Sequence, residues 1–247
     1  MTTDTSAGVT ERELEVSVNG RRVPTVLWTP AGVDAPVPLV LVGHGGSGHK
    51  RHSVVVSMAH GLVTEHGIAA LAIDGPVNGD REENDDGARA LREADRDAYR
   101  RRYYVAKYDQ MVEDWQAALT VAQAQPEVGT GPVGYWGVSM GTRFGLPLVV
   151  AEPRITVAVL GLFGLKPGVE VNQRVYDDAP RLRTPVLFLQ QLDDQQIDRT
   201  AYADLFDLLG TDDRRLHANL GGHAEIPEDE YADSRRFLAR RLAGQRV

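Results

Sequence analysis

The chain has 247 residues, of which 42% are hydrophobic and 25% are charged, a composition typical of a folded globular protein and unlike that of a disordered or fibrous one. Its 27 Lys and Arg residues against 35 Asp and Glu residues give a net charge of −8, which argues against a nucleic-acid partner because phosphate binding needs concentrated positive charge. The lack of cysteine excludes disulfides, thiolate metal sites and a cysteine nucleophile. This length suits one α/β core, so we expect a single domain over residues 1–247.

The N-terminal residues lack a basic start followed by an apolar run, and no later segment has 18 consecutive apolar residues. We therefore expect neither a secretory signal nor a membrane-spanning helix, and a cytoplasmic location.

Alternating apolar segments predict the secondary structure in chain order. The dipeptide Asn19-Gly20 tolerates the positive φ angles of a tight turn, so residues 14–18 and 23–28 are expected to form an antiparallel strand pair. The apolar run 39–42 predicts a strand covered on both faces. Further helices are expected at 53–66, 104–123, after Ser139, at 199–209 and at 228–242, and further strands at 68–73, 133–136, 156–160, 186–189 and 215–220.

Strands separated by helices are typical of right-handed βαβ crossovers. The fold class expected from this alternation is therefore α/β, with a mostly parallel central sheet, helices on both faces and an antiparallel strand pair at the N-terminus. Pro147 falls inside the helix expected after Ser139, where it should kink or shorten that helix because proline lacks a backbone donor.

Two segments interrupt the alternation. Residues 79–102 are densely charged, with acidic residues followed by arginines among helix formers. This segment is either a lid over the site or a helix lying on the surface in contact with water, which is the commoner role of a charge run. Residues 165–183 form a second irregular excursion, which we expect to border the pocket.

The segment Gly137-Val138-Ser139-Met140-Gly141 follows an apolar strand and opens a helix, as a nucleophile elbow does. A serine at such an elbow sits on a strained turn, where side chains two residues before or after it would collide with neighbouring backbone. Ser139 is therefore the expected nucleophile. The alternative is a glycine-rich turn with an inert serine.

The segment His44-Gly45-Gly46-Ser47-Gly48 ends an earlier apolar strand, where the chain turns and presents backbone N–H groups. Such donors hold the oxyanion of a tetrahedral intermediate. We expect the N–H groups of Gly46 and Met140 to do so, because the residue after an elbow serine is the usual second donor. Ser47 is the alternative to Gly46, and His44 is expected to shape the loop.

A base must take the proton of Ser139, and neutral imidazole suits this role. Of seven histidines, His223 stands in a glycine-containing loop between the last strand and the last helix, from which it can reach back over the sheet. His49 and His52 share a spacing suited to one helical face, but no carboxylate joins them at ligand spacing, so we expect no metal site.

The imidazole needs a carboxylate to fix its tautomer. The apolar strand at 186–189 is followed by two acids, Asp193 and Asp194. Either gives the chain order nucleophile, acid, base that α/β-hydrolases use. Only one of the two should reach the histidine, since consecutive side chains leave the backbone in different directions.

Together these motifs make the chain resemble an α/β-hydrolase of the small dienelactone-hydrolase-like or acetyl-xylan-esterase-like kind, over residues 39–242. The segment Ile73-Asp74-Gly75-Pro76, followed by Gly79 and Arg81, also falls in the order of that family. In such proteins the acid lies in a G-x-x-D segment with an aliphatic residue three positions later. Ile197 lies three beyond Asp194, so the resemblance favours Asp194, although Gln191 replaces the glycine.

We therefore expect a serine hydrolase that cleaves small-molecule carboxylic esters through an acyl-enzyme and needs no cofactor. Ser139 in place of cysteine argues against dienelactone hydrolysis itself. Thioesters, lactones and short peptides are alternative substrates, because the fold does not set specificity. A noncatalytic ligand-binding protein on this fold is the alternative of another class, against which the complete Ser-His-Asp set argues. The sequence specifies no oligomeric state.

Overall fold

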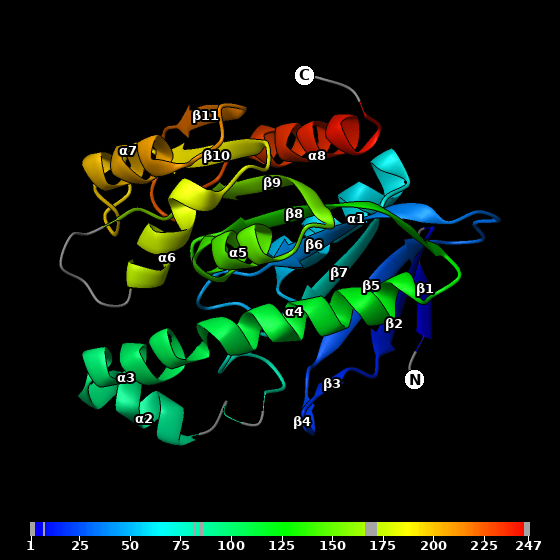
Figure 1. Ribbon diagram of the computed structural model, residues 1–247. Coiled ribbons are helices and arrows are strands. Elements are labelled where there is room, and N and C mark those ends of the chain that lie inside the picture. The colour runs from blue at the N-terminus through cyan, green and yellow to red at the C-terminus, as the bar shows by residue number, and fades with distance from the viewer. Residues whose placement is uncertain (1–2, 7, 82, 84–85, 166–171, 245–247) are drawn as a thin grey trace.

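The computed structural model describes residues 3–6, 8–81, 83, 86–165 and 172–244 (Figure 1). Within these ranges nine strands form one sheet in the order β1-β2-β5-β7-β6-β8-β9-β10-β11. The strands from β7 to β11 in this order are parallel, which confirms the expected mostly parallel sheet. They are β1 (Thr3–Ser6), β2 (Val9–Leu14), β5 (Thr25–Pro30), β6 (Val37–Gly43), β7 (Ala69–Ile73), β8 (Val128–Val138), β9 (Ile155–Gly161), β10 (Val186–Gln191) and β11 (Arg214–Asn219).

The antiparallel pair at the N-terminus is confirmed, with different boundaries from those expected. Asn19 and Gly20 have φ angles of 51° and 81° and turn the chain between the two-residue strands β3 (Ser17–Val18) and β4 (Arg21–Arg22). The longer ladder joins β2 to β5, with Leu14 at the end of β2 opposite Thr25. The interior of β2 is polar and only partly buried, so it lacks the apolar alternation that marks a strand in sequence.

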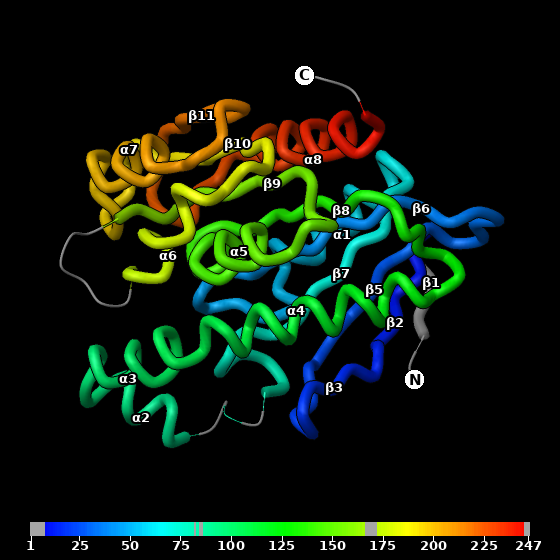
Figure 2. The backbone as a smooth tube through the Cα atoms, viewed as in Figure 1, coloured from blue at the N-terminus to red at the C-terminus, as the bar shows by residue number. Residues whose placement is uncertain are grey.

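Helices cover both faces of the sheet (Figures 1 and 2). Helices α1 (Ser53–His66) and α8 (Glu228–Leu242) pack on one face, around Trp28 and Trp136. Helices α4 (Tyr108–Gln123) and α5 (Met140–Ala151) pack on the other, around Trp115, Tyr135 and Phe188, and Tyr202 of α7 (Arg199–Leu208) joins that core. Each strand of the centre is therefore buried on both sides, as the run of five buried residues in β7 illustrates.

Helix α5 continues through Pro147 to Ala151, so the expected shortening at the proline does not occur. Pro147 and its neighbours Leu146 and Leu148 are fully or almost fully buried. The packing of these apolar side chains outweighs the loss of one backbone donor.

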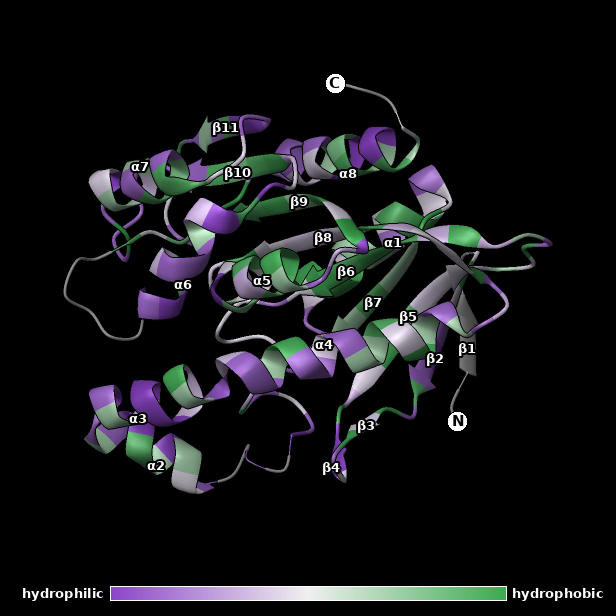
Figure 3. Cartoon of the chain, in the orientation of Figure 1, coloured by the Kyte–Doolittle hydropathy of each residue, from purple (hydrophilic) through white to green (hydrophobic). Residues whose placement is uncertain are grey.

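The charged excursion 79–102 forms two short helices, α2 (Asp86–Ala94) and α3 (Arg96–Tyr103). In Figure 3 α3 is largely hydrophilic and α2 carries both hydrophilic and hydrophobic residues, and both helices stand beyond the N-terminal end of α4. A small apolar cluster that includes Val77, Ala88 and Tyr99 holds them together. Residues 82, 84 and 85 of this excursion, and 166–171 of the second one, lie outside the described residues; the second one otherwise contains α6 (Gln173–Asp178).

Candidate active site

The carboxyl ends of parallel strands meet at one edge of a sheet, and here that edge carries every residue singled out for chemistry. Ser139 directly follows β8, Asp194 follows β10, and His223 lies in the loop after β11. The loop after β6 begins at His44, and Gly43 at the end of β6 pairs with Gly137 of β8. Helices α2, α3, α6 and α7 gather at this end of the sheet (Figure 1).

Ser139 forms a sharp turn between β8 and α5. Its φ of 59° and ψ of −115° fall in a region that residues other than glycine rarely occupy. Glycine is required at position 141 because the turn lies close to the backbone of β6. A Cβ on Gly141 would lie 2.8 Å from the carbonyl oxygen of Gly43. The spacing of the Gly137 to Gly141 motif thus has a steric reason in this fold.

Tyr135 packs its ring directly beneath this turn. A Cβ on Gly43, Gly137 or Gly145 would collide with the phenol, so three glycines make room for one side chain. The Tyr135 hydroxyl donates to the carbonyl oxygen of Gly141 at 2.7 Å. Complete burial raises the pKa of this phenol and keeps it neutral. The ring supports the first turn of α5 from below.

Thr142 ties the elbow to strand β9. Its buried hydroxyl accepts from the N–H of Gly161 at 2.7 Å and lies within hydrogen-bond distance of the carbonyl oxygens of Gly137 and Gly161. The N–H of Ser139 donates to the same Gly161 carbonyl at 2.9 Å. These bonds hold the strained turn against the sheet.

Ser139, His223 and Asp194 form a continuous hydrogen-bonded line. His223 Nε2 lies 2.9 Å from Ser139 Oγ, and His223 Nδ1 lies 2.7 Å from Asp194 Oδ2. A carboxylate only accepts, so Nδ1 carries the proton and the lone pair of Nε2 faces the serine hydroxyl. The geometry is that of a nucleophile, a base and an orienting acid.

The side chain of Asp194 is fully buried and has four donors around its carboxylate. Besides His223, the Tyr202 hydroxyl donates at 2.5 Å, and the N–H groups of Gln196 and Ile197 donate at 2.7 and 3.1 Å. Burial alone would raise the pKa of Asp194, but the hydrogen bonds from Tyr202 and His223 outweigh it and hold this pKa below its usual value. The acid therefore stays ionised beside the imidazole.

Asp193, the other acid of the pair, points away from His223. Its carboxylate accepts from the N–H of Gly221 at 3.0 Å and lies 3.7 Å from Arg199 at the surface, with 54% of its side chain exposed. The N–H of Asp193 also donates to the carbonyl oxygen of Gly221 at 3.1 Å, so one side-chain and one backbone bond connect the acid loop with the histidine loop. The structure brings Asp194, and not Asp193, to the imidazole.

His44 fixes the loop after β6. Its Nδ1 lies 2.7 Å from the carbonyl oxygen of Gly45, and its Nε2 accepts from the N–H of Gly75 at 2.8 Å. Both bonds are satisfied by one neutral tautomer, and burial lowers the pKa of His44 to about 4. His44 therefore holds the loop and is not poised to transfer protons near neutral pH.

Gly46 lies beside the first residue of α5, since a Cβ placed on it would be 4.0 Å from the Cβ of Met140. Asn78 holds the same loop through its side-chain amide, which donates to the carbonyl oxygens of Gly46 and Gly48 at 3.2 and 3.0 Å. The two expected oxyanion donors are thus neighbours in space. Ser47, the alternative donor, also lines the cavity at Ser139.

Several of these contacts were not expected from sequence. Tyr202 contacts Asp194 from another element eight residues further on, while Thr142 and Asn78 contact residues 19 and 32 positions away. Asn78 lies near the Asp74-Gly75 segment that the family resemblance singled out. Asp74 itself is fully buried and pairs with Lys50 through both the backbone N–H and the ammonium group, at 2.8 Å each. This ion pair joins the loops after β6 and β7.

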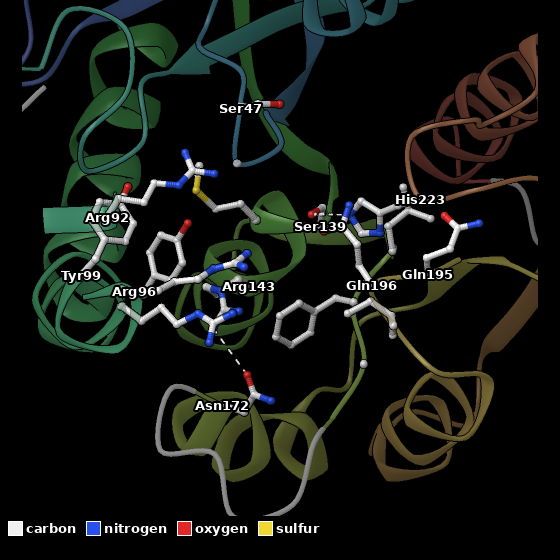
Figure 4. Close-up of a pocket in the computed structure, with 18 residues that line it drawn as sticks. Ser47, Arg92, Arg96, Tyr99, Ser139, Arg143, Asn172, Gln195, Gln196 and His223 are labelled. Carbon is white, nitrogen blue, oxygen red and sulfur yellow. Dashed lines mark hydrogen bonds between the residues drawn. The ribbon is translucent and has the colours of Figure 1, made fainter. Parts of the chain in front are cut away.

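A cavity of about 680 Å³ opens at Ser139 and His223 (Figure 4), within the range of small-molecule sites. Arg92, Arg96, Tyr99 and Arg100 of α2 and α3 line it, so the charged excursion 79–102 borders the site. The second excursion contributes Asn172 to this lining.

His49 and His52 lie with their rings edge to face, 6.2 Å apart. In the described part of the chain, no three His, Cys, Asp or Glu side chains are grouped as metal ligands would be. None of the helices in those ranges has the length and apolar character to span a membrane.

Comparison with known families gives one match, the dienelactone hydrolase family, over residues 23–215. No curated protein matches the sequence. Among solved structures, a PEG-bound cold-adapted esterase from an Arctic intertidal metagenomic library is 36% identical, with a TM-score of 0.84 and 97% of each chain covered.

Two more distant structures share the fold. Est1E from Butyrivibrio proteoclasticus is 15% identical, with a TM-score of 0.69, over 94% of this chain and 99% of its own. The dienelactone hydrolase-like promiscuous phosphotriesterase P91 from metagenomic libraries is 21% identical, with a TM-score of 0.69, over 96% of this chain and 99% of its own.

Proposed function

The chain belongs to the dienelactone hydrolase family, as its motifs led us to expect, and we propose that it cleaves carboxylic esters by acyl transfer to Ser139. The observation that carries this proposal is the line of hydrogen bonds from Ser139 Oγ through His223 to the buried Asp194. A serine hydroxyl is a weak nucleophile by itself, and an adjacent base oriented by a third group is the arrangement that activates it.

In the first step Ser139 Oγ attacks the ester carbonyl carbon while His223 Nε2 takes the hydroxyl proton. The imidazolium that forms is stabilised by the carboxylate of Asp194, which does not itself become protonated. His223 then gives the proton to the leaving alkoxide, and the alcohol departs. The product of this half-reaction is an acyl ester on Ser139.

The N–H groups of Gly46 and Met140 are proposed to stabilise the negative charge that develops on the carbonyl oxygen by donating hydrogen bonds to it. The N–H of Gly46 and the carbonyl of Gly45 belong to one planar peptide unit and point in opposite directions. That carbonyl is held by His44 and by the N–H of Gly48 at 3.0 Å. His44 therefore acts as a positioning residue that sets the direction of the Gly46 donor, and preorganised donors need no rearrangement when the charge develops.

In the second half-reaction a water molecule takes the place of the alcohol. His223 removes its proton, the hydroxyl adds to the acyl carbon, and the bond to Ser139 Oγ breaks as His223 returns the proton to the serine. The carboxylic acid product leaves. The cavity volume suits acyl groups of small or medium size.

The proposal is tested with a fluorophosphonate probe and with 4-nitrophenyl butyrate. We expect the probe to label Ser139 and the ester to be hydrolysed. The variant Ser139→Ala should lose labelling and lower kcat by about 10⁴ to 10⁶, while circular dichroism shows an intact fold. Near wild-type turnover in this variant would refute the proposal.

A further inference from the structure

A buried glutamine reaches from the sheet into the loop that carries His223. Gln191 is the last residue of β10 and is 1% exposed. Leu187 and Leu189 of the same strand belong to the core beneath α1 and α8. Because side chains alternate along a strand, Gln191 points to that same face, on which the chain runs from β11 to α8. The G-x-x-D pattern has glycine at this place, so the side chain of Gln191 is a departure from it.

The turn that carries His223 spans Gly222 to Glu225. The N–H of Glu225 donates to the carbonyl oxygen of Gly222 at 3.0 Å, and the Glu225 carboxylate accepts from the N–H of Gly222 at 2.6 Å. His223 is the second residue of this turn, and its ring faces Ser139 (Figure 4). The place of the base therefore depends on where the two ends of the turn are held.

The side-chain amide of Gln191 contacts both ends of the turn. Its Nε2 donates to the carbonyl oxygen of Glu225 at 2.7 Å and lies 3.4 and 3.5 Å from those of Gly222 and Leu220. A Cβ on Gly221 would lie 3.3 Å from this nitrogen, so glycine at 221 leaves room for the amide. All three partners are acceptors, which fixes the orientation of the amide because an oxygen turned towards them would be repelled.

The other end of the amide adds no bond. Gln191 Oε1 is buried and has no hydrogen-bond partner among the described residues. A buried acceptor without a partner lowers stability, and Gln191→Met would remove it together with the donor. The carbonyl oxygen of Glu225 would then turn to water, since Glu225 is exposed. Stability alone therefore gives little reason for an amide at this position.

The backbone of Gln191 supports the acid as well. Its N–H donates to the hydroxyl of Tyr202, and that hydroxyl donates to Asp194 at 2.5 Å. The end of β10 thus holds the orienting acid through its backbone and the turn of the base through its side chain.

We infer that Gln191 is a positioning residue, whose amide fixes the turn Gly222 to Glu225 so that His223 Nε2 stays within reach of Ser139 Oγ. This inference rests on the proposed esterase function and adds to it a residue that does not touch the reacting atoms. Misplacing a reacting group by about 1 Å can cost about 10² in rate. A looser turn should therefore lower kcat and leave KM unchanged.

The variant Gln191→Met tests this, because it keeps the length of the side chain and removes both polar atoms. We expect kcat for 4-nitrophenyl butyrate and the rate of fluorophosphonate labelling to fall by about 10- to 100-fold, with KM within about twofold of wild type. The melting temperature should change by less than about 4 °C, since the lost bond and the lost unpartnered acceptor offset each other. Amide hydrogen exchange should become faster in peptides covering residues 220–226 and stay unchanged in those from β8.

Gln190→Met is the matched control. Gln190 is the preceding residue of the same strand and is 8% exposed, but its side chain leaves on the opposite face, with that of Phe188. This control should keep wild-type kcat and loop exchange. Gln191→Glu keeps the shape but turns a carboxylate oxygen towards the three carbonyl oxygens, so it should lose more kcat than Gln191→Met. If Gln191→Met does not fold, Gln191→Gly takes its place, because it removes the same bonds.

The inference is wrong if a folded Gln191→Met protein keeps wild-type kcat and loop exchange, or if Gln190→Met loses as much activity. It is also wrong if the loss appears in KM and the melting temperature instead of kcat. Turnover by wild type would then leave the proposed function standing. If wild type neither hydrolyses the ester nor reacts with the probe, the proposed function fails, and exchange in residues 220–226 alone decides whether Gln191 holds the turn.

Discussion

The assignment of the orienting acid makes a sharp prediction, because two adjacent aspartates differ in their contacts. In Asp194→Asn the amide oxygen can keep the two backbone donors of the Gln196 and Ile197 N–H groups. The amide NH₂ then faces His223 Nδ1, where the carboxylate oxygen was. A donor facing a donor forces the imidazole to move its proton to Nε2, which then cannot accept the proton of Ser139.

The magnitude follows from the bonds that change. Loss of a hydrogen bond to a charged group costs about 1.5–3 kcal/mol, and a buried donor left without an acceptor costs about 1–3 kcal/mol. The sum of about 2.5–6 kcal/mol corresponds to a loss of about 10² to 10⁴ in kcat. The upper end is the loss of about 10⁴ known for this substitution in the best-studied serine triad.

The assay is kcat for 4-nitrophenyl butyrate, and Asp193→Asn is the matched control. The substitution is the same and lies one residue away, but the Asp193 carboxylate is 54% exposed and bonds to Gly221 instead of His223. We expect this control to lose less than about threefold. The reasoning is refuted if Asp193→Asn is the crippled enzyme, or if a folded Asp194→Asn protein keeps more than about a tenth of wild-type kcat.

Three further outcomes are expected. Thr142→Val keeps the shape but leaves the buried Gly161 N–H without its acceptor, so urea unfolding should show a loss of about 1–3 kcal/mol. His44→Gln should lower kcat by about 10² with little change in KM, because the Gly46 donor loses its support; an equal rise in KM would point to substrate binding instead. Wild-type stability should fall between about pH 6.5 and 4, since the pKa of His44 is lowered to about 4 and the unfolded chain takes up the proton first. This pH-dependent loss, up to about 3 kcal/mol, should be absent from the His44→Gln protein when unfolding is measured across that pH range.

The parts of this molecule that sequence predicts well are local ones. The strand that leads into Ser139 is a buried apolar run, and the glycines on either side of the serine mark the turn in the sequence, although the contact that requires Gly141 is with the distant carbonyl of Gly43. The acid and the base could be placed approximately for the same reason, because each follows the end of a predicted strand. Choosing between Asp193 and Asp194 needed the direction of each side chain, which the family resemblance indicated and the residue pattern alone did not.

Contacts between distant segments could not be foreseen. Tyr202 reaches Asp194 only because α7 packs back on the sheet, and Arg143 meets Tyr104 only because the turn after α3, which contains Tyr104, lies against α5. Strand β2 begins at Val9, whereas the sequence pattern predicts a strand that begins at residue 14. Its stability comes from hydrogen bonds to β5 and not from an apolar pattern of its own, so its residues carried no periodic signal.

The fit between Tyr135 and the glycines around it also bears on how sequences of this kind change over time. Alanine at Gly43, Gly137 or Gly145 is excluded while the phenol is present, because the new methyl group would occupy the space of the ring. A smaller residue at 135 would remove that conflict, but it would first open a cavity beneath Ser139 and break the bond to Gly141. Each single step is therefore harmful although the combined change need not be, which is sign epistasis. Drift by single substitutions is blocked at these four positions, and they are expected to persist or be replaced as a set.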